Sequence, residues 1–283
     1  MIFINGENSQ IAKSIKFLHK GNFNYLNRTR LDLSNNLSIE SFFKKNSLEI
    51  FINCAAYTNV NKAEEEKTKS LQINSNSLEI ICYYCKKFNI NLLHFSSDYI
   101  FDGKKNNLYQ EDDKPNPINY YGYTKHMSEI IILSKLKNYK IFRTSGIFSF
   151  FKKNILLTIL KKSKEENLIK LVVDQTSSPT SSYEIAKFLI YILSNKEYLN
   201  NNGIYNLVSS DNLSWYEYGI LVKKIFKLKR LKIEEINLSE FNSDTYRPIN
   251  SALSMDKTQK AFKYNFPSIE KSLMSLKILN EKY

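Results

Sequence analysis

Short apolar segments alternate with helical patterns through residues 1–145 of this 283-residue chain, and this alternation limits the folds open to it. In the helical patterns apolar residues fall on one face, as Ile11, Ile15 and Leu18 do. Strands separated by helices favour a parallel sheet covered on both faces, with ligands bound at the carboxyl ends of its strands. We therefore predict an α/β protein with a doubly wound parallel sheet of the Rossmann type. The predicted strands are 1–5, 23–26, 49–53, 91–95 and 139–142, and 67–88 is predicted to be a helix.

The first strand leads into a turn with the context of a dinucleotide-binding site. In such turns, glycines let a pyrophosphate approach backbone N–H groups at the N-terminus of a helix. The three spaced positions hold Gly6, Ser9 and Ala12, so only the first is glycine. Ser9 and Ala12 are small enough for close approach, although a purely structural strand-to-helix turn also explains the pattern.

The residues about twenty positions later bear on cofactor choice, because an acidic residue there would hold the adenosine 2′-hydroxyl of NAD. The chain has Arg28 and Arg30 instead, and an arginine can pair with the 2′-phosphate of NADP. We therefore expect NADPH as the cofactor, with NADH possible. The alternative is that both arginines are solvated loop residues.

The second half of the chain is less regular. A polar loop at 174–180 precedes a predicted helix at 183–193, and a late strand is predicted near 204–208. We expect residues 1–145, together with the late strand, to form the NAD(P)-binding domain. Residues 146–283 are then expected to form mostly a smaller α/β lobe that binds the substrate.

The composition argues against several other classes of protein. The chain is 42% hydrophobic and 13% aromatic, which favours a packed core over disorder. No apolar run approaches the roughly 20 residues that span a membrane, and the first residues lack the basic region of a signal peptide. We therefore expect a soluble cytoplasmic protein without a membrane partner. The net charge of +13 comes from dispersed lysines, whereas a nucleic-acid footprint is clustered, so no nucleic-acid partner is predicted.

Cys82 and Cys85 have the CxxC spacing found in redox and metal sites. They lie in a segment with helical apolar rhythm, where cysteine acts as a small buried hydrophobic residue. The three histidines, His19, His94 and His126, are scattered along the chain. No metal site is therefore predicted.

Tyr121 and Lys125 are four residues apart at the start of a predicted helix, so they share one face of it. A free tyrosine has a pKa of about 10, and a neighbouring ammonium group is expected to lower it. Tyr121 would then give its proton to a carbonyl oxygen while a hydride reaches the carbon, and Lys125 could hold the nicotinamide ribose.

Ser97 follows a predicted strand, where its hydroxyl could orient the same carbonyl. Ser97 and Asp98 are also explained as ordinary loop or capping residues. A tyrosine and a lysine four apart are common by chance in a chain with 19 tyrosines. The assignment of a catalytic site therefore depends on these residues occurring together.

A set of motifs, in order over nearly the whole chain, resembles the dTDP-4-dehydrorhamnose reductase family. The resemblance implies NAD(P)H-dependent reduction of the 4-keto group of a dTDP-linked 6-deoxysugar, the last step of dTDP-L-rhamnose synthesis. It implies a dTDP-sugar as the binding partner and leaves a homodimer possible. The motifs are 53–58, 96–103, 121–125, 143–145, 174–175, 178–180, 214–217 and 247–251.

The resemblance also assigns site residues. It implies Ser97, Tyr121 and Lys125 as the catalytic trio, with serine where the family commonly has threonine. It implies that Val60, Ser97, Asp98 and Tyr99 contact the substrate. The implied cofactor-binding residues are Gly6, Ser9, Gln10, Ile11, Asp32, Leu33, Ala55, Ala56, Tyr57, Tyr121 and Lys125.

Besides the incomplete glycine turn, the chain departs from the family pattern at two positions. Gly146 stands where the family typically has a tryptophan beside the sugar, and the loss of an indole removes a large apolar wall. Asn61 replaces a usual acidic residue. These departures leave the sugar and its stereochemistry open. They also leave two alternatives: a reductase of another nucleotide-linked keto sugar, or a non-catalytic binding subunit such as the regulatory subunit of methionine adenosyltransferase, which is similar to this family.

Overall fold

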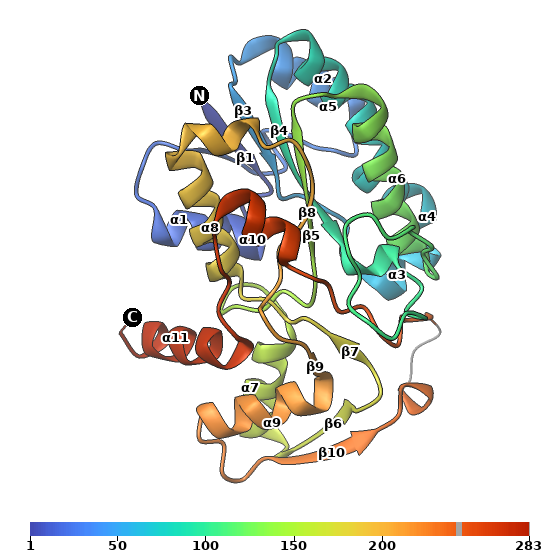
Figure 1. Cartoon of the computed structure of the whole chain (residues 1–283), viewed down its shortest axis with the longest axis vertical. Coiled ribbons are helices and arrows are strands. Elements are labelled where there is room, and N and C mark those ends of the chain that lie inside the picture. Colours follow the sequence, from blue (N-terminus) through green and yellow to red (C-terminus); the bar gives the residue numbers. More distant parts are fainter. Residues whose placement is uncertain (242–244, 283) are drawn as a thin grey trace.

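Six parallel strands form the sheet of a larger lobe, which lies above a smaller lobe in Figure 1. The computed structural model describes residues 1–241 and 245–282. The strand order is β2-β1-β3-β4-β5-β8, so β2 lies on one side of β1 and β3 and the later strands lie on the other. This reversal is the switch point at which doubly wound sheets bind ligands. The strands are β1 (Ile2–Asn5), β2 (Asn24–Leu26), β3 (Ile50–Asn53), β4 (Asn91–Ser97), β5 (Tyr139–Thr144) and β8 (Gly203–Asn206).

These strands confirm the predicted fold class and lie within a few residues of the predicted positions. Two of them are longer than predicted, because β4 continues to Ser97 and β5 to Thr144. The parallel ladder between them ends with Ser97 opposite Thr144. The end of β4 therefore carries Ser97 to the ligand-binding edge of the sheet.

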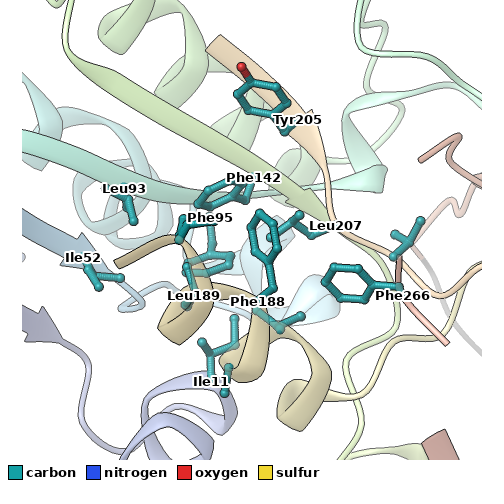
Figure 2. Close-up of a cluster of buried hydrophobic side chains, with 14 of the residues drawn as sticks. Ile11, Ile52, Leu93, Phe95, Phe142, Phe188, Leu189, Tyr205, Leu207 and Phe266 are labelled. Atoms are coloured by element: carbon teal, nitrogen blue, oxygen red, sulfur yellow. The ribbon is translucent and has the colours of Figure 1, made fainter. Parts of the chain in front are cut away.

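Apolar clusters on both faces of the sheet hold the helices in place. On one face, α1 (Gln10–Leu18) packs against α8 (Ser182–Ser194), and Figure 2 shows Ile11, Phe188 and Leu189 against strand residues such as Phe142. Three more helices pack in sequence on the opposite cluster. They are α2 (Asn36–Lys45), α5 (Ser77–Lys87) and α6 (Tyr120–Lys135).

The helix predicted at 67–88 is interrupted. It consists of α4 (Lys67–Leu71), a π-helical turn (Gln72–Asn76) and α5, preceded by the short helix α3 (Val60–Glu65). The wide turn places the buried Asn74 side chain where its oxygen accepts from Tyr57 N (2.8 Å) and its nitrogen donates to Thr124 Oγ1 (2.9 Å). Such turns insert one residue to serve a local contact. This one joins the loop after β3 to helix α6.

The smaller lobe has its own apolar cluster and two short two-stranded sheets. β6 pairs with β10 in parallel, and β7 pairs with β9 in antiparallel fashion. Helix α10 (Asp256–Phe262) returns to the larger lobe and contacts β8. The other elements are α7 (Ile155–Glu165), β6 (Leu168–Val172), β7 (Thr176–Ser177), β9 (Leu213–Ser214), α9 (Trp215–Ile225), β10 (Lys232–Ile236) and α11 (Ile269–Lys282), with 3-10 turns at 98–100, 196–200 and 238–240.

The CxxC cysteines lie in α5, where Cys82 and Cys85 are both buried in the apolar cluster. Burial raises the pKa of each thiol, which keeps them protonated. Among residues 1–241 and 245–282, no three metal-binding side chains gather into a group. In the same described part of the chain, every helix is too short or too polar to cross a bilayer.

Lys140, at the start of β5, gives a prediction about stability and pH. Its ammonium group is buried, donates to Leu199 O (2.5 Å), and burial lowers its pKa from 10.5 to about 8. Between those pH values the folded state loses the proton before the unfolded state does, so this residue makes stability rise with pH. The Lys140→Met variant lacks this contribution. We therefore expect the free energy of unfolding of the variant, relative to that of wild type, to decrease as the pH rises from about 8 to 10.5. Urea unfolding across this range tests it, and a constant difference would contradict it.

Candidate active site

A cleft of about 690 Å³ opens at the carboxyl ends of the strands, between the two lobes. Its size falls within the range of small-molecule and cofactor sites. Its walls include the β1–α1 turn, the ends of β3 and β4, helix α6, and segments of the smaller lobe. All the site residues predicted from the sequence line it, namely Gly6, Ser9, Gln10, Ile11, Asp32, Leu33, Ala55, Ala56, Tyr57, Val60, Ser97, Asp98, Tyr99, Tyr121 and Lys125.

The turn after β1 requires glycine at its first position and has a capped helix after it. Gly6 has φ +78°, and a Cβ there would lie 2.7 Å from Ala55 N, so both conformation and packing require glycine. Ser9 caps α1 by accepting from Ala12 N (3.1 Å). The first-turn N–H groups and the positive end of the helix dipole are thus presented at the cleft.

The Gln10 side chain joins the two lobes. Its Nε2 donates to Ile147 O (3.0 Å), and its Oε1 accepts from Ser149 Oγ (2.7 Å) and Asn154 Nδ2 (3.1 Å). This amide is therefore occupied by the loop that precedes α7. The bonds depend on residues far apart in the sequence, so local pattern could not predict them.

The two arginines predicted near the end of β2 have different positions. Arg28 lines the cleft, where its Nε donates to Asp32 Oδ2 (3.0 Å) and its Nη2 to Ser34 Oγ (3.1 Å). Arg30 donates to Tyr25 O and lines a separate surface groove. Partial burial opposes ionisation of Asp32, but hydrogen bonds from Ser34 and Arg28 lower its pKa below the ordinary value. Only Arg28 is therefore placed to meet a ligand in the cleft.

Helix α6 brings Tyr121 and Lys125 into the cleft. Asn119 caps the helix by accepting from Gly122 N (2.8 Å), and a Cβ at Gly122 would lie 2.0 Å from Tyr99 O. Glycine at this position therefore allows the first turn of α6 to pack directly against the segment after β4. This close approach places Tyr121 beside Ser97 and Tyr99, which both affect its pKa.

The electrostatics of the pair differ from our prediction. Burial raises the pKa of Tyr121 far above the ordinary value, and a hydrogen bond with Ser97 opposes this only in part. Burial also lowers the pKa of Lys125 to about 8, with Glu129 acting in the opposite direction. The expected lowering of the Tyr121 pKa by Lys125 is therefore wrong for this structure, because desolvation dominates. The Lys125 amine lies instead 3.3 Å from His94 Nε2.

Ser97 lines the cleft and also caps the turn after β4, as the interpretation of Ser97 as a capping residue predicts. Its Oγ donates to Asp98 Oδ1 (3.0 Å) and accepts from Tyr99 N (3.2 Å). Asp98 Oδ2 also accepts from Ser145 Oγ (2.7 Å) and Ser251 Oγ (2.6 Å). Burial raises the Asp98 pKa, and these hydroxyls act against that rise. Ser145 and Ser251 lie inside recognised motifs, but only the fold shows that they share one carboxylate.

The space beside Gly146 is filled. A Cβ at Gly146 would lie 2.8 Å from the Trp215 ring, and Gly146 has φ +48°. The Trp215 Nε1 donates to Gln175 Oε1 (3.1 Å), and both side chains line the cleft. An indole wall is therefore present, supplied by the start of α9. Asn61, the other departure, accepts from Arg247 Nη2 (2.6 Å).

A buried ion pair fixes α6 on the sheet. Arg143 of β5 makes two parallel bonds to Glu129, with Nε–Oε1 at 3.0 Å and Nη2–Oε2 at 2.8 Å, and both side chains are 2% exposed. Arg143 Nη1 also donates to Glu111 O (3.0 Å). Since Glu129 is one turn after Lys125, the pair holds the helix with the face that carries Tyr121 and Lys125 toward the cleft.

Comparisons with known proteins agree with this arrangement. A family model described as the RmlD substrate binding domain matches residues 1–280. The dTDP-4-dehydrorhamnose reductase of Aggregatibacter actinomycetemcomitans is 30% identical over 274 residues, covering 92% of each chain. That of Sinorhizobium fredii is 28% identical, covering 96% of this chain and 95% of the relative.

Solved structures show the same fold. The chain is similar to the dTDP-4-dehydrorhamnose reductase of Bacillus anthracis in complex with NADP, with TM-score 0.92, 24% identity and 98% coverage of both chains. A Clostridium acetobutylicum dTDP-4-dehydrorhamnose reductase has TM-score 0.91, 25% identity and 99% coverage of both. The chain therefore belongs to the RmlD family, together with the dTDP-4-dehydrorhamnose reductases.

Proposed function

We propose that this protein is an NADPH-dependent oxidoreductase that reduces dTDP-4-dehydro-L-rhamnose to dTDP-L-rhamnose. The observation that carries the proposal is the convergence of Tyr121, Lys125 and Ser97 on one cleft with the N-terminus of α1. The relatives named above share this activity by name, and the similar Bacillus anthracis structure contains NADP. In this proposal the larger lobe binds the cofactor and the smaller lobe binds most of the substrate.

The residues at the β1–α1 turn fit a dinucleotide. Gly6 has no side chain to block the approach of a ligand to the backbone, and Ser9 and Ala12 are small. The first N–H groups of α1 would then donate to a pyrophosphate bound at this turn. Arg28 at the cleft suits a 2′-phosphate. When bound, NADPH supplies the hydride that reduces the ketone.

Tyr121 is the proposed proton donor. Burial raises its pKa, so the phenol carries its proton at neutral pH and can release it only to a strongly basic oxygen. A ketone oxygen gains such basicity as the hydride reaches its carbon, and the proton then completes the new hydroxyl group. The Lys125 ammonium group, one helical turn away, stabilises the resulting phenolate until a solvent proton replaces the one lost.

The remaining predicted residues have proposed roles in orientation. The Ser97 hydroxyl, which donates to Asp98 Oδ1 in this structure, would turn to donate to the ketone oxygen instead and hold it near Tyr121. Val60 and Tyr99 are proposed to contact the substrate, and Trp215 would form the apolar wall beside the sugar.

The direct test of the proposed function is an assay of the purified protein with NADPH and dTDP-4-dehydro-L-rhamnose. We expect loss of the nicotinamide absorbance band and formation of dTDP-L-rhamnose. Persistence of that band with this substrate, together with tight binding of NADPH, would support a non-catalytic binding subunit. Activity with other dTDP-linked keto sugars only would show that the enzyme reduces a different substrate.

Substitution of Arg28 tests the choice of cofactor. Arg28→Ala removes a charge-assisted contact to the 2′-phosphate, so we expect the KM for NADPH to rise about tenfold or more and the KM for NADH to change little. Arg30→Ala is the matched control, because Arg30 lies outside the cleft. Equal NADPH/NADH selectivity in Arg28→Ala and wild type would show that this arginine does not read the phosphate.

A further inference from the structure

A chain of buried polar side chains runs across the sheet from the β1–α1 turn to Lys125. Asn5 Oδ1 accepts from Gly6 N (2.9 Å), and Asn5 Nδ2 donates to Asn53 Oδ1 (3.4 Å). Asn53 Nδ2 lies 3.3 Å from His94 Nδ1, and His94 Nε2 lies 3.3 Å from Lys125 Nζ. The four side chains from Asn5 to Lys125 are each at most 2% exposed. Polar groups this deeply buried must satisfy one another.

The donors and acceptors of this chain define the protonation of the His94 ring. Asn53 Oδ1 accepts from Ala55 N (3.3 Å) as well as from Asn5, so the NH₂ group of Asn53 faces His94. His94 Nδ1 must therefore accept, and in a neutral ring the proton is then on Nε2. Burial, aided by the charge of Lys125, lowers the His94 pKa well below its ordinary value, which keeps the ring neutral.

The Nε2–H group has a hydroxyl oxygen within its reach. Ser128 Oγ lies 3.2 Å from His94 Nε2, and the Ser128 hydroxyl gives its own proton to Lys125 O (2.5 Å). Ser128 Oγ is thus available to accept from the ring. The ring consequently has no lone pair for the Lys125 ammonium group, although the two nitrogens are 3.3 Å apart.

We propose that His94 is a positioning residue for Lys125. The Nε2 edge of its ring lies against the lysine from the side of the sheet and offers the ammonium group no acceptor, so the ammonium protons find their acceptors on the cleft side, toward Tyr121 and the bound ligands. Glu129, on the same helix, also acts on the charge of the amine, and it is held by Arg143. His94 thereby connects the orientation of the catalytic lysine to the asparagines that support the phosphate turn.

The tautomer can be observed without any turnover. We expect ¹⁵N NMR of the ring nitrogens to show His94 as the neutral Nε2–H form throughout about pH 5 to 9, whereas an exposed histidine titrates in this range. His94→Gln identifies the signal by its loss. A ring protonated on Nδ1, or one that becomes charged within this range, would overturn the proposal whether or not the protein is a reductase.

A kinetic test of the positioning role of His94 rests on the proposed function and compares two variants of this residue. We expect His94→Leu to lower kcat roughly tenfold to a hundredfold, with a smaller change in the KM for the sugar nucleotide and a shifted alkaline limb of the pH profile, because a displaced lysine no longer acts on Tyr121. His94→Gln keeps an amide N–H that can donate to Ser128 Oγ in place of the ring, and we expect it to recover most of kcat.

Thr258→Val is the matched control, since it removes one buried hydrogen bond, to Asn206 O, on α10. We expect its kcat and pH profile to equal those of wild type. If His94→Leu keeps the wild-type kcat and pH profile, or if His94→Gln is no better than His94→Leu, His94 has no positioning role. An inactive wild-type protein would refute the proposed function, and the NMR measurement would then decide this inference alone.

Discussion

Tyr121→Phe is expected to lower kcat by about 10²–10⁴-fold while leaving the dissociation constant for NADPH nearly unchanged. The substitution removes one oxygen atom and keeps the ring, which packs edge-to-face on Tyr99 with ring centroids 6.0 Å apart. Stability should therefore change little. The large effect is expected on catalysis alone, because the phenol is the proposed proton donor to the ketone.

The matched control is Tyr123→Phe, on the same helix two residues later and 41% exposed. It removes the same atom from a side chain that does not line the cleft. We expect it to retain wild-type kcat. If Tyr121→Phe retained full activity, the proton would have to come from another group, and the proposed mechanism would be wrong.

Arg143→Ala is expected to lower the free energy of unfolding by about 3–5 kcal/mol, because it leaves Glu129 charged and buried without a partner. The protein also loses the contact of the guanidinium group with the Phe101 ring (5.2 Å) and its bond to Glu111 O. Urea unfolding at neutral pH measures the loss. Activity should fall as well, since Glu129 and Arg143 hold the helix that carries Tyr121 and Lys125.

A double variant separates lost pairing from lost packing. Replacing both partners with apolar residues, as in Arg143→Met with Glu129→Met, removes the uncompensated charge and should be less destabilising than Arg143→Ala. The surface pair Lys44–Glu40 represents an exposed ion pair, and such pairs contribute only about 0–1 kcal/mol to stability. A loss below about 1 kcal/mol in Arg143→Ala would show that the pair does not hold α6 in place.

The sheet and its ligand-binding edge were predictable from the sequence because they depend on local pattern. Apolar runs such as Ile50–Asn53 have the length and composition of buried parallel strands, and a parallel sheet brings the ends of its strands together. Gly6 could be placed for the same reason, since a strand followed at once by a helix requires a tight turn. The predicted residues lie in one cleft because they follow strands that end at the same edge of the sheet.

The partners of the site residues could not be predicted in this way. Lys125 was expected to act mainly on Tyr121, yet its amine lies against His94, which comes from a strand 31 residues earlier. Gly146 suggested an open space, yet Trp215 fills it from helix α9, far along the chain. Such contacts follow from how elements pack, and desolvation by packing is the largest cause of the pKa shifts of Tyr121 and Lys125.

The most direct test of the account is the fate of the hydride and the proton on the substrate. The wild-type protein should be incubated with dTDP-4-dehydro-L-rhamnose and NADPH deuterated at the transferable position, and the product analysed by NMR. We predict dTDP-L-rhamnose with deuterium on the carbon of the former ketone, and no such product from Tyr121→Phe on the same time scale. Deuterium at another carbon, or unchanged NADPH, would contradict the account.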